Sequence, residues 1–414
     1  MIHLTMEAGA AEVVSRLLHA GYDAYVVGGC VRDALLGHEA NDWDVCTSAL
    51  PEETIALFGE DNCIPTGLKH GTVTVKMLGG LYEVTTFRTE SAYSDGRHPD
   101  RVDFVCDVRE DLSRRDFTIN AMAYNDRAGL VDPFGGREDL FEHRIVRAVG
   151  EPMKRFDEDA LRIMRLFRFA SRFGFAIGEE TLRAAVALRG KLPCVSGERI
   201  REELMKLLET NAPSAYMPKA VLDVILPGME PVGEEAYARV LCAVDALSPD
   251  SELRLAALLS PLGDAPAAMK PLRCSNKTTQ RVLGALEGAK AEYEESDAAL
   301  CIRARRMLGS EGLNAIEDME RLSQVICSKD AAKRIQRLLW HAQEAHTRGL
   351  CVSIRQLQVN GGDLLRLTDG NGGKRIGQAL EHLLSAVLRE EIPNEKEALL
   401  CAARAYLSEE RETT

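Results

Sequence analysis

Two aspartates separated by one residue, Asp42 and Asp44, have the type and spacing to bind a divalent cation together. A strand is predicted over residues 43–46, and residues two apart on a strand point to the same face. Both carboxylates would then be directed to one place, as Mg²⁺ requires when substrate phosphates complete its shell. Glu83, in a second strand-like run, offers a third carboxylate, although a surface-facing strand residue explains it equally well. The pair therefore predicts a metal site.

A glycine turn, Gly28-Gly29, lies just upstream, between a predicted strand over residues 24–27 and a predicted short helix over residues 31–36. Because glycine has no Cβ, the backbone N–H groups of such a turn can approach a phosphate closely, and a helix N-terminus adds a partial positive charge. Arg32 would add a charge-assisted hydrogen bond to the same phosphate. Most Gly-Gly pairs are only turns, so the pattern alone leaves both interpretations open.

Adjacent arginines, Arg114 and Arg115, precede Asp116 and Asn120. Two guanidinium groups can hold a triphosphate while a neighbouring carboxylate orients one of them. Taken alone, a surface cluster of salt bridges is the simpler explanation.

Several charged residues recur at helical spacing further along the chain: Asp159, Arg162, Arg165 and Arg168. Residues three apart are neighbours on one helix face, so the Asp acceptor would lie beside an Arg donor. Cytosine and adenine present an amino donor next to a ring-nitrogen acceptor, whereas uracil and guanine present the reverse pattern. Such a pair would accept C and A and exclude U and G. The alternative is a helix start with Asp157 as its N-cap and the following acidic residues complementing the helix dipole.

The elements that must hold these residues change in character near residue 137. Before it, helix and strand patterns alternate, with a β-hairpin predicted over residues 71–87 around Gly79-Gly80. A helix opened by Ser48 and strands over residues 101–106 and 119–124 are also predicted. After it, periodic Leu, Ala and Ile segments run to the end. The predicted fold class is an α+β head with a mixed sheet, followed by all-α parts.

Composition narrows the class of protein further. The chain has 414 residues, 45% hydrophobic and 28% charged, which suits several globular domains. A net charge of −13 argues against a generally basic nucleic-acid binder, but residues 144–172 carry eight basic and four acidic residues, which leaves a local basic strip or a solvated helix face. Eleven cysteines without a Cys-x-x-Cys pair indicate free thiols in the cytoplasm. There is no signal-peptide layout at the start, and no apolar run approaches the ~18 residues of a membrane helix.

Taken in order, these motifs resemble the class II tRNA nucleotidyltransferases, the CCA-adding enzymes of the polymerase β superfamily, in the form without a phosphohydrolase domain. The matching stretches are residues 26–33, 42–44, 83–88, 114–123, 132–136, 158–168 and 198–204, with a looser likeness at 360–365. The resemblance implies a catalytic nucleotidyltransferase head over residues 1–137 and a helical neck with the nucleotide template over 138–212. A helical body over 213–290 and a helical tail over 291–414 would bind tRNA.

The resemblance also implies a role for each motif. Asp42 and Asp44 would bind two Mg²⁺ ions, and Glu83 would complete the catalytic acidic set. The triphosphate would be held by the residues of the glycine turn and the arginine cluster: Gly28, Gly29, Arg32, Arg114, Arg115 and Asn120. Asp159 and Arg162 would be the protein template, with Arg165 and Arg168 near the nucleotide or primer.

The implied reaction is template-independent addition and repair of the 3′-terminal CCA of tRNA with CTP and ATP, releasing pyrophosphate. The expected partner is the 3′ end and acceptor stem of tRNA, with no DNA and no membrane, and the oligomeric state is left open. One alternative is a bacterial poly(A) polymerase, which the acidic residues 407–414 disfavour. Another is a partial CC-adding or A-adding enzyme; the complete-looking segment over residues 91–99 disfavours the CC-adding form.

Overall fold

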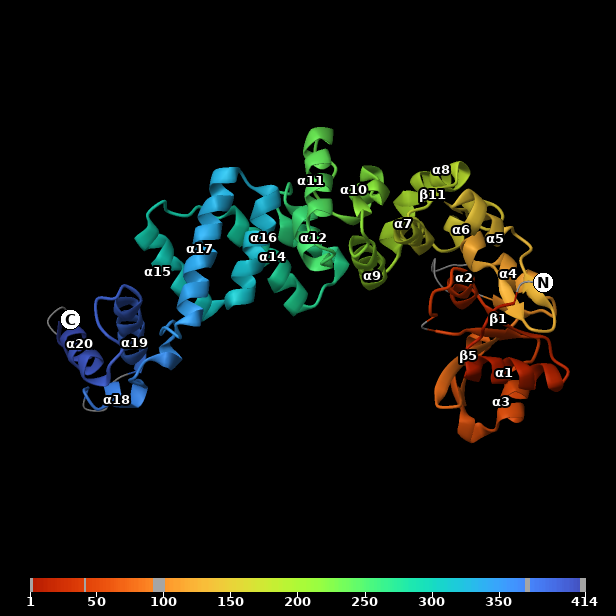
Figure 1. Cartoon of the computed structure of the whole chain (residues 1–414), viewed down its shortest axis with the longest axis horizontal. Coiled ribbons are helices and arrows are strands. Elements are labelled where there is room, and N and C mark those ends of the chain that lie inside the picture. Colours follow the sequence, from red (N-terminus) through yellow and green to blue (C-terminus); the bar gives the residue numbers. More distant parts are fainter. Residues whose placement is uncertain (1–2, 41, 92–100, 369–372, 410–414) are drawn as a thin grey trace. The chain divides into compact units, whose positions relative to one another are not determined.

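The computed structural model describes the chain except for residues 1–2, 41, 92–100, 369–372 and 410–414 (Figure 1). It separates into two compact units, Met1–Pro231 with Ala267–Arg273, and Val232–Pro266 with Cys274–Thr414. The finer four-part division at residues 137, 212 and 290 stays a prediction. Within the described residues, no helix is both long and apolar enough to cross a membrane.

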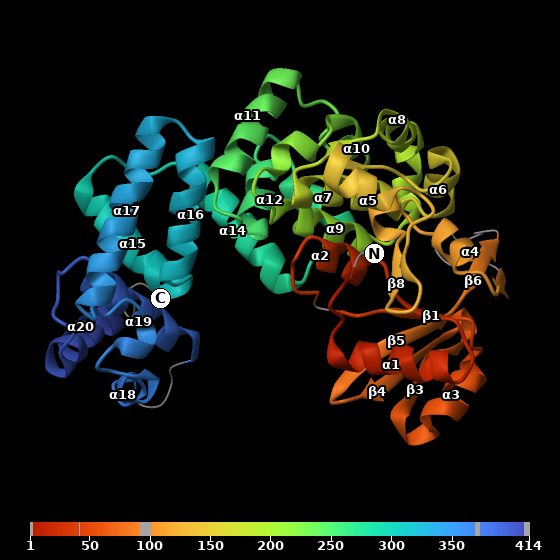
Figure 2. The same cartoon turned by 45° about the vertical axis from the view of Figure 1, so that its right-hand side comes forward.

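A seven-stranded mixed sheet lies at the centre of the first part of the first unit. Its order is β3 (Cys63–Gly67), β4 (Thr72–Met77), β5 (Gly80–Thr86), β2 (Val45–Thr47), β1 (Ala24–Val27), β8 (Ala123–Asn125) and β9 (Gly129–Val131). Strands β2 and β5 are parallel, and the other neighbours are antiparallel. Helices α1 (Ala8–His19) and α3 (Pro51–Phe58) pack on this sheet (Figure 2). The predicted α+β head is confirmed.

Apolar patterning explains which strands lie inside. Strand β1 is buried at all four positions, as expected for a central strand covered on both faces. In β4, fully buried Val73 and Val75 alternate with threonines, so only one face of that strand meets the core. The predicted hairpin joins β4 to β5, but its turn residues are Leu78 and Gly79 and not Gly79 and Gly80, because Gly80 pairs with Met77 in the ladder. Both turn residues have positive φ, at 48° and 84°. Those values suit the primed turns that match strand twist.

Some predicted boundaries are wrong. Strand β2 starts at Val45, two residues later than predicted, although the Asp44 carbonyl still accepts a hydrogen bond from the Val27 N–H. Helix α3 starts at Pro51 after Leu50, not at Ser48. The strand predicted over residues 119–124 is a short 3₁₀ turn, Thr118–Asn120, followed by β8.

The remaining strands form two small sheets, β6 (Arg88–Ser91) with β7 (Arg101–Phe104) and β10 (Ile145–Val146) with β11 (Ala176–Ile177). The other helices of the first unit are α2 (Gly29–Leu35), α4 (Val108–Ser113), α5 (Gly136–Glu138), α6 (Pro152–Glu158), α7 (Leu161–Phe173), α8 (Glu179–Leu188), α9 (Gly197–Leu208) and α10 (Lys219–Ile225). Helix α13 (Ala265–Met269) has its first two residues in the second unit and the others in the first.

The second unit is helical in its described part. It contains α11 (Glu234–Ala246), α12 (Ser251–Leu259), α14 (Asn276–Lys290), α15 (Asp297–Ser310), α16 (Leu313–Ile326), α17 (Lys329–Thr347), α18 (Gly361–Leu365), α19 (Gly373–Leu388) and α20 (Lys396–Glu409). This confirms the predicted change from mixed to helical structure.

Candidate active site

Three predicted carboxylates gather at the edge of the sheet where β2 begins. The backbone N–H of Val27 donates to the Asp44 carbonyl at 3.0 Å, which fixes Asp44 at the entrance to the strand. The next residue, Val45, pairs with Val84 of β5, so Asp44 lies beside Glu83. Desolvation of the Asp44 carboxyl by the surrounding protein raises its pKa, and the charges of Glu83 and Asp42 add to this effect. The positive charge of Arg115 lowers the pKa in part. Asp42, Asp44 and Glu83 are therefore electrostatic neighbours, as predicted.

The chemistry of this acidic set fits a hard cation. Carboxylate oxygens are the ligands that Mg²⁺ takes in proteins, and mutual repulsion among acids is relieved when a cation binds between them. Asp42 and Asp44 are exposed, so an ion with its water ligands has access to them. Within the described residues, no three acidic, His or Cys side chains already stand in a ligand cluster. Substrate oxygens would have to complete the coordination shell.

The glycine turn is shaped around Arg115. Gly28 has φ of 84°, and a Cβ placed there would lie 2.7 Å from Arg115 Nη1. A side chain at this position would displace the guanidinium, so glycine is needed both for the backbone conformation and for the close approach. Among the described residues, Arg115 Nε and Asp111 Oδ2 are buried without a hydrogen-bond partner. The Arg115 guanidinium lies near Asp44, and its exposed part could bind an added anion.

Arg114 and Arg115 share one buried carboxylate. Arg114 Nη2 lies 2.8 Å from Asp111 Oδ1, and Arg115 Nη2 lies 3.6 Å from Asp111 Oδ2. Asp111 is fully buried in α4, accepts hydrogen bonds from Arg114 and lies within ion-pair distance of Arg115. This explains how a carboxylate orients the cluster, and it favours a structured site over a surface cluster of salt bridges.

Arg32 is directed into the protein. Only 3% exposed, it donates to both oxygens of Asp33 at 2.9 Å and to Asn120 Oδ1. Its guanidinium also lies over the rings of Phe169 and Phe173, 5.3 and 5.0 Å from their centroids. The predicted contacts of Arg32 and Asn120 with the triphosphate stay predictions, and in this arrangement both residues brace α2.

The helix predicted to start at Asp157 is interrupted two residues later. Asp157 lies inside α6, so the N-cap prediction is wrong. At Asp159 the backbone is extended, with φ of −140°, and α7 begins at Leu161. Asp159 Oδ1 accepts from the Leu161 N–H at 3.0 Å, and Oδ2 accepts from Arg199 Nη2 at 3.0 Å. Asp159 thus serves as a local cap for α7 and also has a long-range partner.

The second template residue, Arg162, is 9% exposed. Its guanidinium donates to Glu158 at 3.0 Å and to two backbone carbonyls, those of Arg155 at 3.2 Å and Arg114 at 3.1 Å. The bond to Arg114 joins α7 to the arginine cluster of the head. Asp159 and Arg162 lie close in sequence, but each is held by a different partner.

Arg165 and Arg168 form ion pairs within the first unit. Arg165 Nε donates to Asp116 at 2.8 Å, and Arg168 Nε donates to Glu203 of α9. Both guanidinium groups also lie over the Phe169 ring, at 5.3 and 4.0 Å from its centroid. Their predicted place near the nucleotide or primer stays a prediction.

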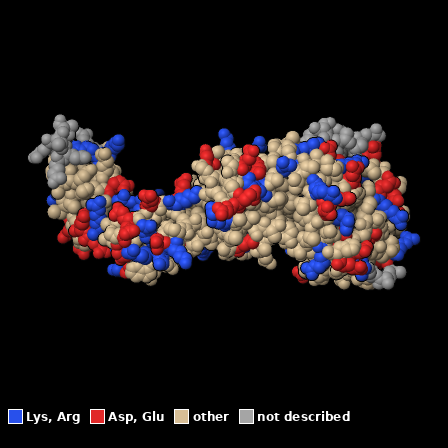
Figure 3. All heavy atoms as spheres, turned by 90° about the horizontal axis from the view of Figure 1, so that it is seen from above, with Lys and Arg blue, Asp and Glu red and all other residues tan. Residues whose placement is uncertain are grey.

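The basic segment over residues 144–172 is therefore neither a simple strip nor a plain solvated face. Most of its arginines have internal acidic partners, in the pairs Arg147–Asp139, Arg155–Glu158, Arg162–Glu158, Arg165–Asp116, Arg168–Glu203 and Arg172–Asp33. On the face shown in Figure 3, basic and acidic side chains are interspersed. On this face, an RNA contact would use particular residues and not a uniform basic surface.

Two acid–base partners, Arg199 and Glu203, were missed as functional candidates, although they lie in the matching stretch over residues 198–204. The sequence contains one signal for Glu203. Helix α9 buries Ile200, Leu204 and Leu207, and Glu203 falls on this same face, where it is 6% exposed. A charged residue on the apolar face of a helix needs a partner. Of the predicted segment over residues 91–99, only Ser91 lies within the described residues.

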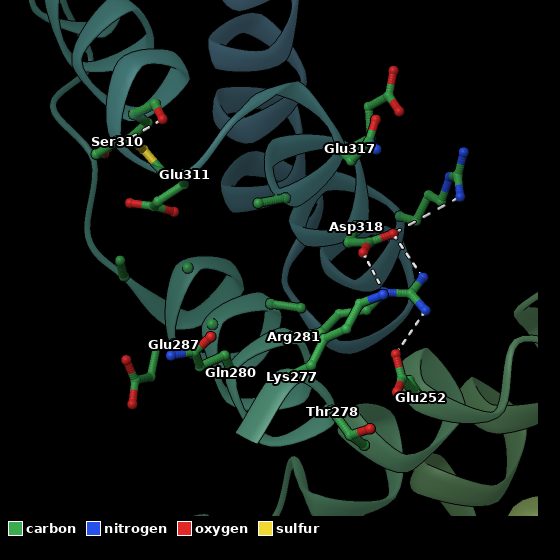
Figure 4. Close-up of a pocket in the computed structure, with 18 of the residues that line it drawn as sticks. Glu252, Lys277, Thr278, Gln280, Arg281, Glu287, Ser310, Glu311, Glu317 and Asp318 are labelled. Atoms are coloured by element: carbon green, nitrogen blue, oxygen red, sulfur yellow. Dashed lines mark hydrogen bonds and ion pairs between the residues drawn. The ribbon is translucent and has the colours of Figure 1, made fainter. Parts of the chain in front are cut away.

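The second unit has a pocket of ≈1360 Å³ between α12, α14, α15 and α16. Figure 4 shows Arg281 pointing across it, bonded to Glu252 at 2.9 Å and to Asp318 at 2.7 Å. Hydrogen bonds to Asp318, Asp250 and Glu252 raise the pKa of Arg281. Every predicted catalytic and nucleotide-binding residue lies in the first unit, so the pocket is not the candidate active site.

Three family models match successive parts of the chain. Residues 24–147 match the Poly A polymerase head domain, and residues 174–231 match a probable RNA and SrmB-binding site of polymerase A. Residues 249–403 match a putative tRNA nucleotidyltransferase domain 2.

Known proteins resemble the chain over nearly its whole length. A CCA-adding enzyme from Geobacillus stearothermophilus is 36% identical over 413 residues, covering 98% of this chain and 97% of that protein. One from Lactiplantibacillus plantarum is 36% identical over 405 residues, covering 95% of each.

Solved structures agree. The crystal structure of the Bacillus stearothermophilus CCA-adding enzyme in complex with CTP matches with a TM-score of 0.78 at 32% identity, covering 99% of this chain and 100% of that chain. The Thermotoga maritima CCA-adding enzyme complexed with tRNA, at 22% identity, TM-score 0.62 and coverage of 96% and 94%, supports the fold. Because the identity to the curated relatives extends over almost all of both chains, this protein belongs to the family of CCA-adding enzymes.

Proposed function

We propose that the chain adds and repairs the 3′-terminal CCA of tRNA, using CTP and ATP and releasing pyrophosphate. The observation that carries the proposal is the gathering of Asp42, Asp44 and Glu83 beside Arg115, in a chain of the CCA-adding family. The tRNA 3′-hydroxyl would attack the α-phosphate of the nucleotide, and the bond to pyrophosphate would break.

Mg²⁺ is the cation proposed for the acidic set. Bound as two ions, it would lower the pKa of the attacking hydroxyl at one position and neutralise charge on the leaving pyrophosphate at the other. Asp42 and Asp44 would hold it, with Glu83 completing the negative set. Desolvation of Asp44 and, more weakly, the charges of Glu83 and Asp42 raise its pKa, and a cation bound between these carboxylates would relieve their repulsion.

Arg115 is proposed as the main phosphate contact. Its side chain is 21% exposed, lies against Gly28 and has a buried Nε without a partner among the described residues. The guanidinium would hold the triphosphate through charge-assisted hydrogen bonds, with Asp111 fixing its direction. Arg114, held by the same carboxylate, would reinforce the positive charge.

Base selection is proposed to fall to Asp159 and Arg162. An ionised carboxylate only accepts hydrogen bonds and a guanidinium only donates them, so together they match the edges of C and A. Arg162 is held by Glu158 and two carbonyls, which keep it extended toward the head. A bound base would take over one of these donors.

Primer extension would test the function. The purified protein is incubated with tRNA ending at the discriminator base and with each labelled triphosphate in turn. Growth by three residues that needs only CTP and ATP is the expected result. A long A tract would select the poly(A) polymerase alternative, and arrest after two C residues, or A addition only to tRNA ending in CC, would select a partial enzyme. The cytoplasmic location indicated by the eleven free cysteines stays a prediction.

A further inference from the structure

Helix α9 carries two charged residues, one turn apart, that reach the charged residues around α7. Arg199 binds Asp159, and Glu203 binds Arg168 and lies 3.8 Å from Arg165. Helices α7 and α9 pack against each other in the first unit (Figures 1 and 2). Three of the four residues with a predicted role near the base or primer therefore contact α9.

The contact between Arg199 and Asp159 can fix the orientation of the Asp159 carboxylate. The side chains are 24% and 14% exposed, and Arg199 Nη2 lies 3.0 Å from Asp159 Oδ2. The other oxygen, Oδ1, accepts from the Leu161 N–H at 3.0 Å. With one donor on each oxygen, the carboxylate plane cannot rotate freely. Each oxygen still has a second lone pair for an incoming amino group.

The start of α9 is itself anchored on its other side. A Cβ at Gly197 would lie 1.8 Å from the Pro271 carbonyl oxygen, so the helix begins in direct contact with the segment Ala267–Arg273. Glu198 pairs with Arg273 at 3.0 Å, and Arg201 donates to the Arg273 carbonyl. The first turn of α9 is therefore fixed, and Arg199 projects from a rigid base.

We propose that Arg199 is a positioning residue that determines nucleotide specificity by holding the carboxylate of Asp159 in the plane that meets the base edge. The inference rests on the proposed function, because it requires Asp159 to face the base. A carboxylate held in one plane accepts a hydrogen bond from the amino group of C or A and repels the carbonyl oxygen of U or G. Without Arg199 the carboxylate turns away from the base edge, so correct addition slows and rejection weakens.

The test compares Arg199→Met and Arg199→Lys with Lys206→Met, a change at an exposed basic residue of the same helix. Single-turnover incorporation is measured with CTP and UTP on tRNA ending at the discriminator base, and with ATP and GTP on tRNA ending in CC. Arg199→Met should lower both preference ratios about tenfold, and Arg199→Lys should restore part of the loss. Lys206→Met should leave both ratios unchanged, because Lys206 is exposed in the last turn of α9, away from the first turn that carries Arg199.

A double variant separates the two hypotheses. If Arg199 acts through Asp159, adding Arg199→Met to Asp159→Asn should change the ratios no further than Asp159→Asn alone. Wild-type ratios in both Arg199 variants, with collapsed ratios in Asp159→Asn, would overturn the role of Arg199 and keep the template. A wild-type protein that adds neither C nor A would instead refute the proposed function. Thermal unfolding identifies any variant that has lost its fold. If Arg199→Met is unfolded, the preference ratios of Arg199→Lys, which keeps the charge, decide whether Arg199 affects specificity.

Discussion

Arg165 of α7 and Asp116 of the head form an ion pair, with 2.6 Å between Nη2 and Oδ2, that ties the helix carrying Arg162 to the sheet-bearing part of the first unit. Asp116 also accepts from Asn120 Nδ2 at 3.1 Å and from the Phe117 N–H at 2.8 Å. Although burial alone raises the pKa of this carboxyl, Arg165 and Asn120 outweigh it and lower the pKa to about 2. The ion pair therefore helps to fix the position of α7 relative to the segment that contains Asp116.

Asp116→Asn should destabilise the first unit by about 2 to 4 kcal/mol, because Arg165 would be left with less negative charge around it. The effect depends on pH in a defined direction. The native pKa of about 2 lies below the ordinary 3.8, so ionised Asp116 stabilises the fold above pH 3.8, and this contribution is lost as the pH falls toward 2. Chemical denaturation should show the gap between variant and wild type narrowing from pH 7 to pH 3. A constant gap would exclude this carboxylate as the source.

Asp42→Ala and Asp44→Ala should each reduce addition of both C and A by about 10³-fold or more, because the proposed metal contribution is several kcal/mol. Both residues are exposed, so the variants should unfold near the wild-type temperature and still bind tRNA. Glu60→Ala, at another exposed acid of the head, is the matched control and should be fully active. Near-normal turnover in either aspartate variant would remove the metal assignment.

Arg162→Lys should preserve the charge but lose the forked donor set, since a lysine cannot reach Glu158 and two carbonyls at once. We expect selectivity against UTP and GTP to fall by about 1–3 kcal/mol, measured as the ratio of single-nucleotide incorporation rates. A purely structural arginine would slow all four nucleotides alike and leave the ratios intact.

Arg281→Met should destabilise the second unit by about 1–3 kcal/mol, because one guanidinium joins Asp250 and Glu252 of the α12 start to Asp318 of α16. Arg303→Met, at an exposed residue lining the same pocket, is the control and should change the unfolding temperature little. The rate of CTP addition to a short acceptor-stem RNA should be unaffected, since the nucleotide residues lie in the first unit. Equal unfolding temperatures for the two variants would show that the three-acid contact contributes nothing.

The sequence predicted local structure well and long-range partners poorly. Alternation in β4 and the glycine after Leu78 are local signals, and the hairpin they predict is present. The glycine turn and Asp44, which were both selected from the sequence, lie near Arg115 in the structure. The break at Asp159 was missed because acidic residues suit a helix start, and nothing nearby reveals that Arg199, 40 residues away, would hold that carboxylate. Likewise Glu203 reaches Arg168 across 35 residues, a pairing that helical periodicity does not specify.

The close approach of Arg115 to Gly28 has an evolutionary consequence. A side chain at position 28 would collide with the guanidinium and would also need a backbone conformation that only glycine adopts readily. A larger residue at position 28 would move the end of the Arg115 side chain, so changes at the two positions should tend to occur together among related sequences.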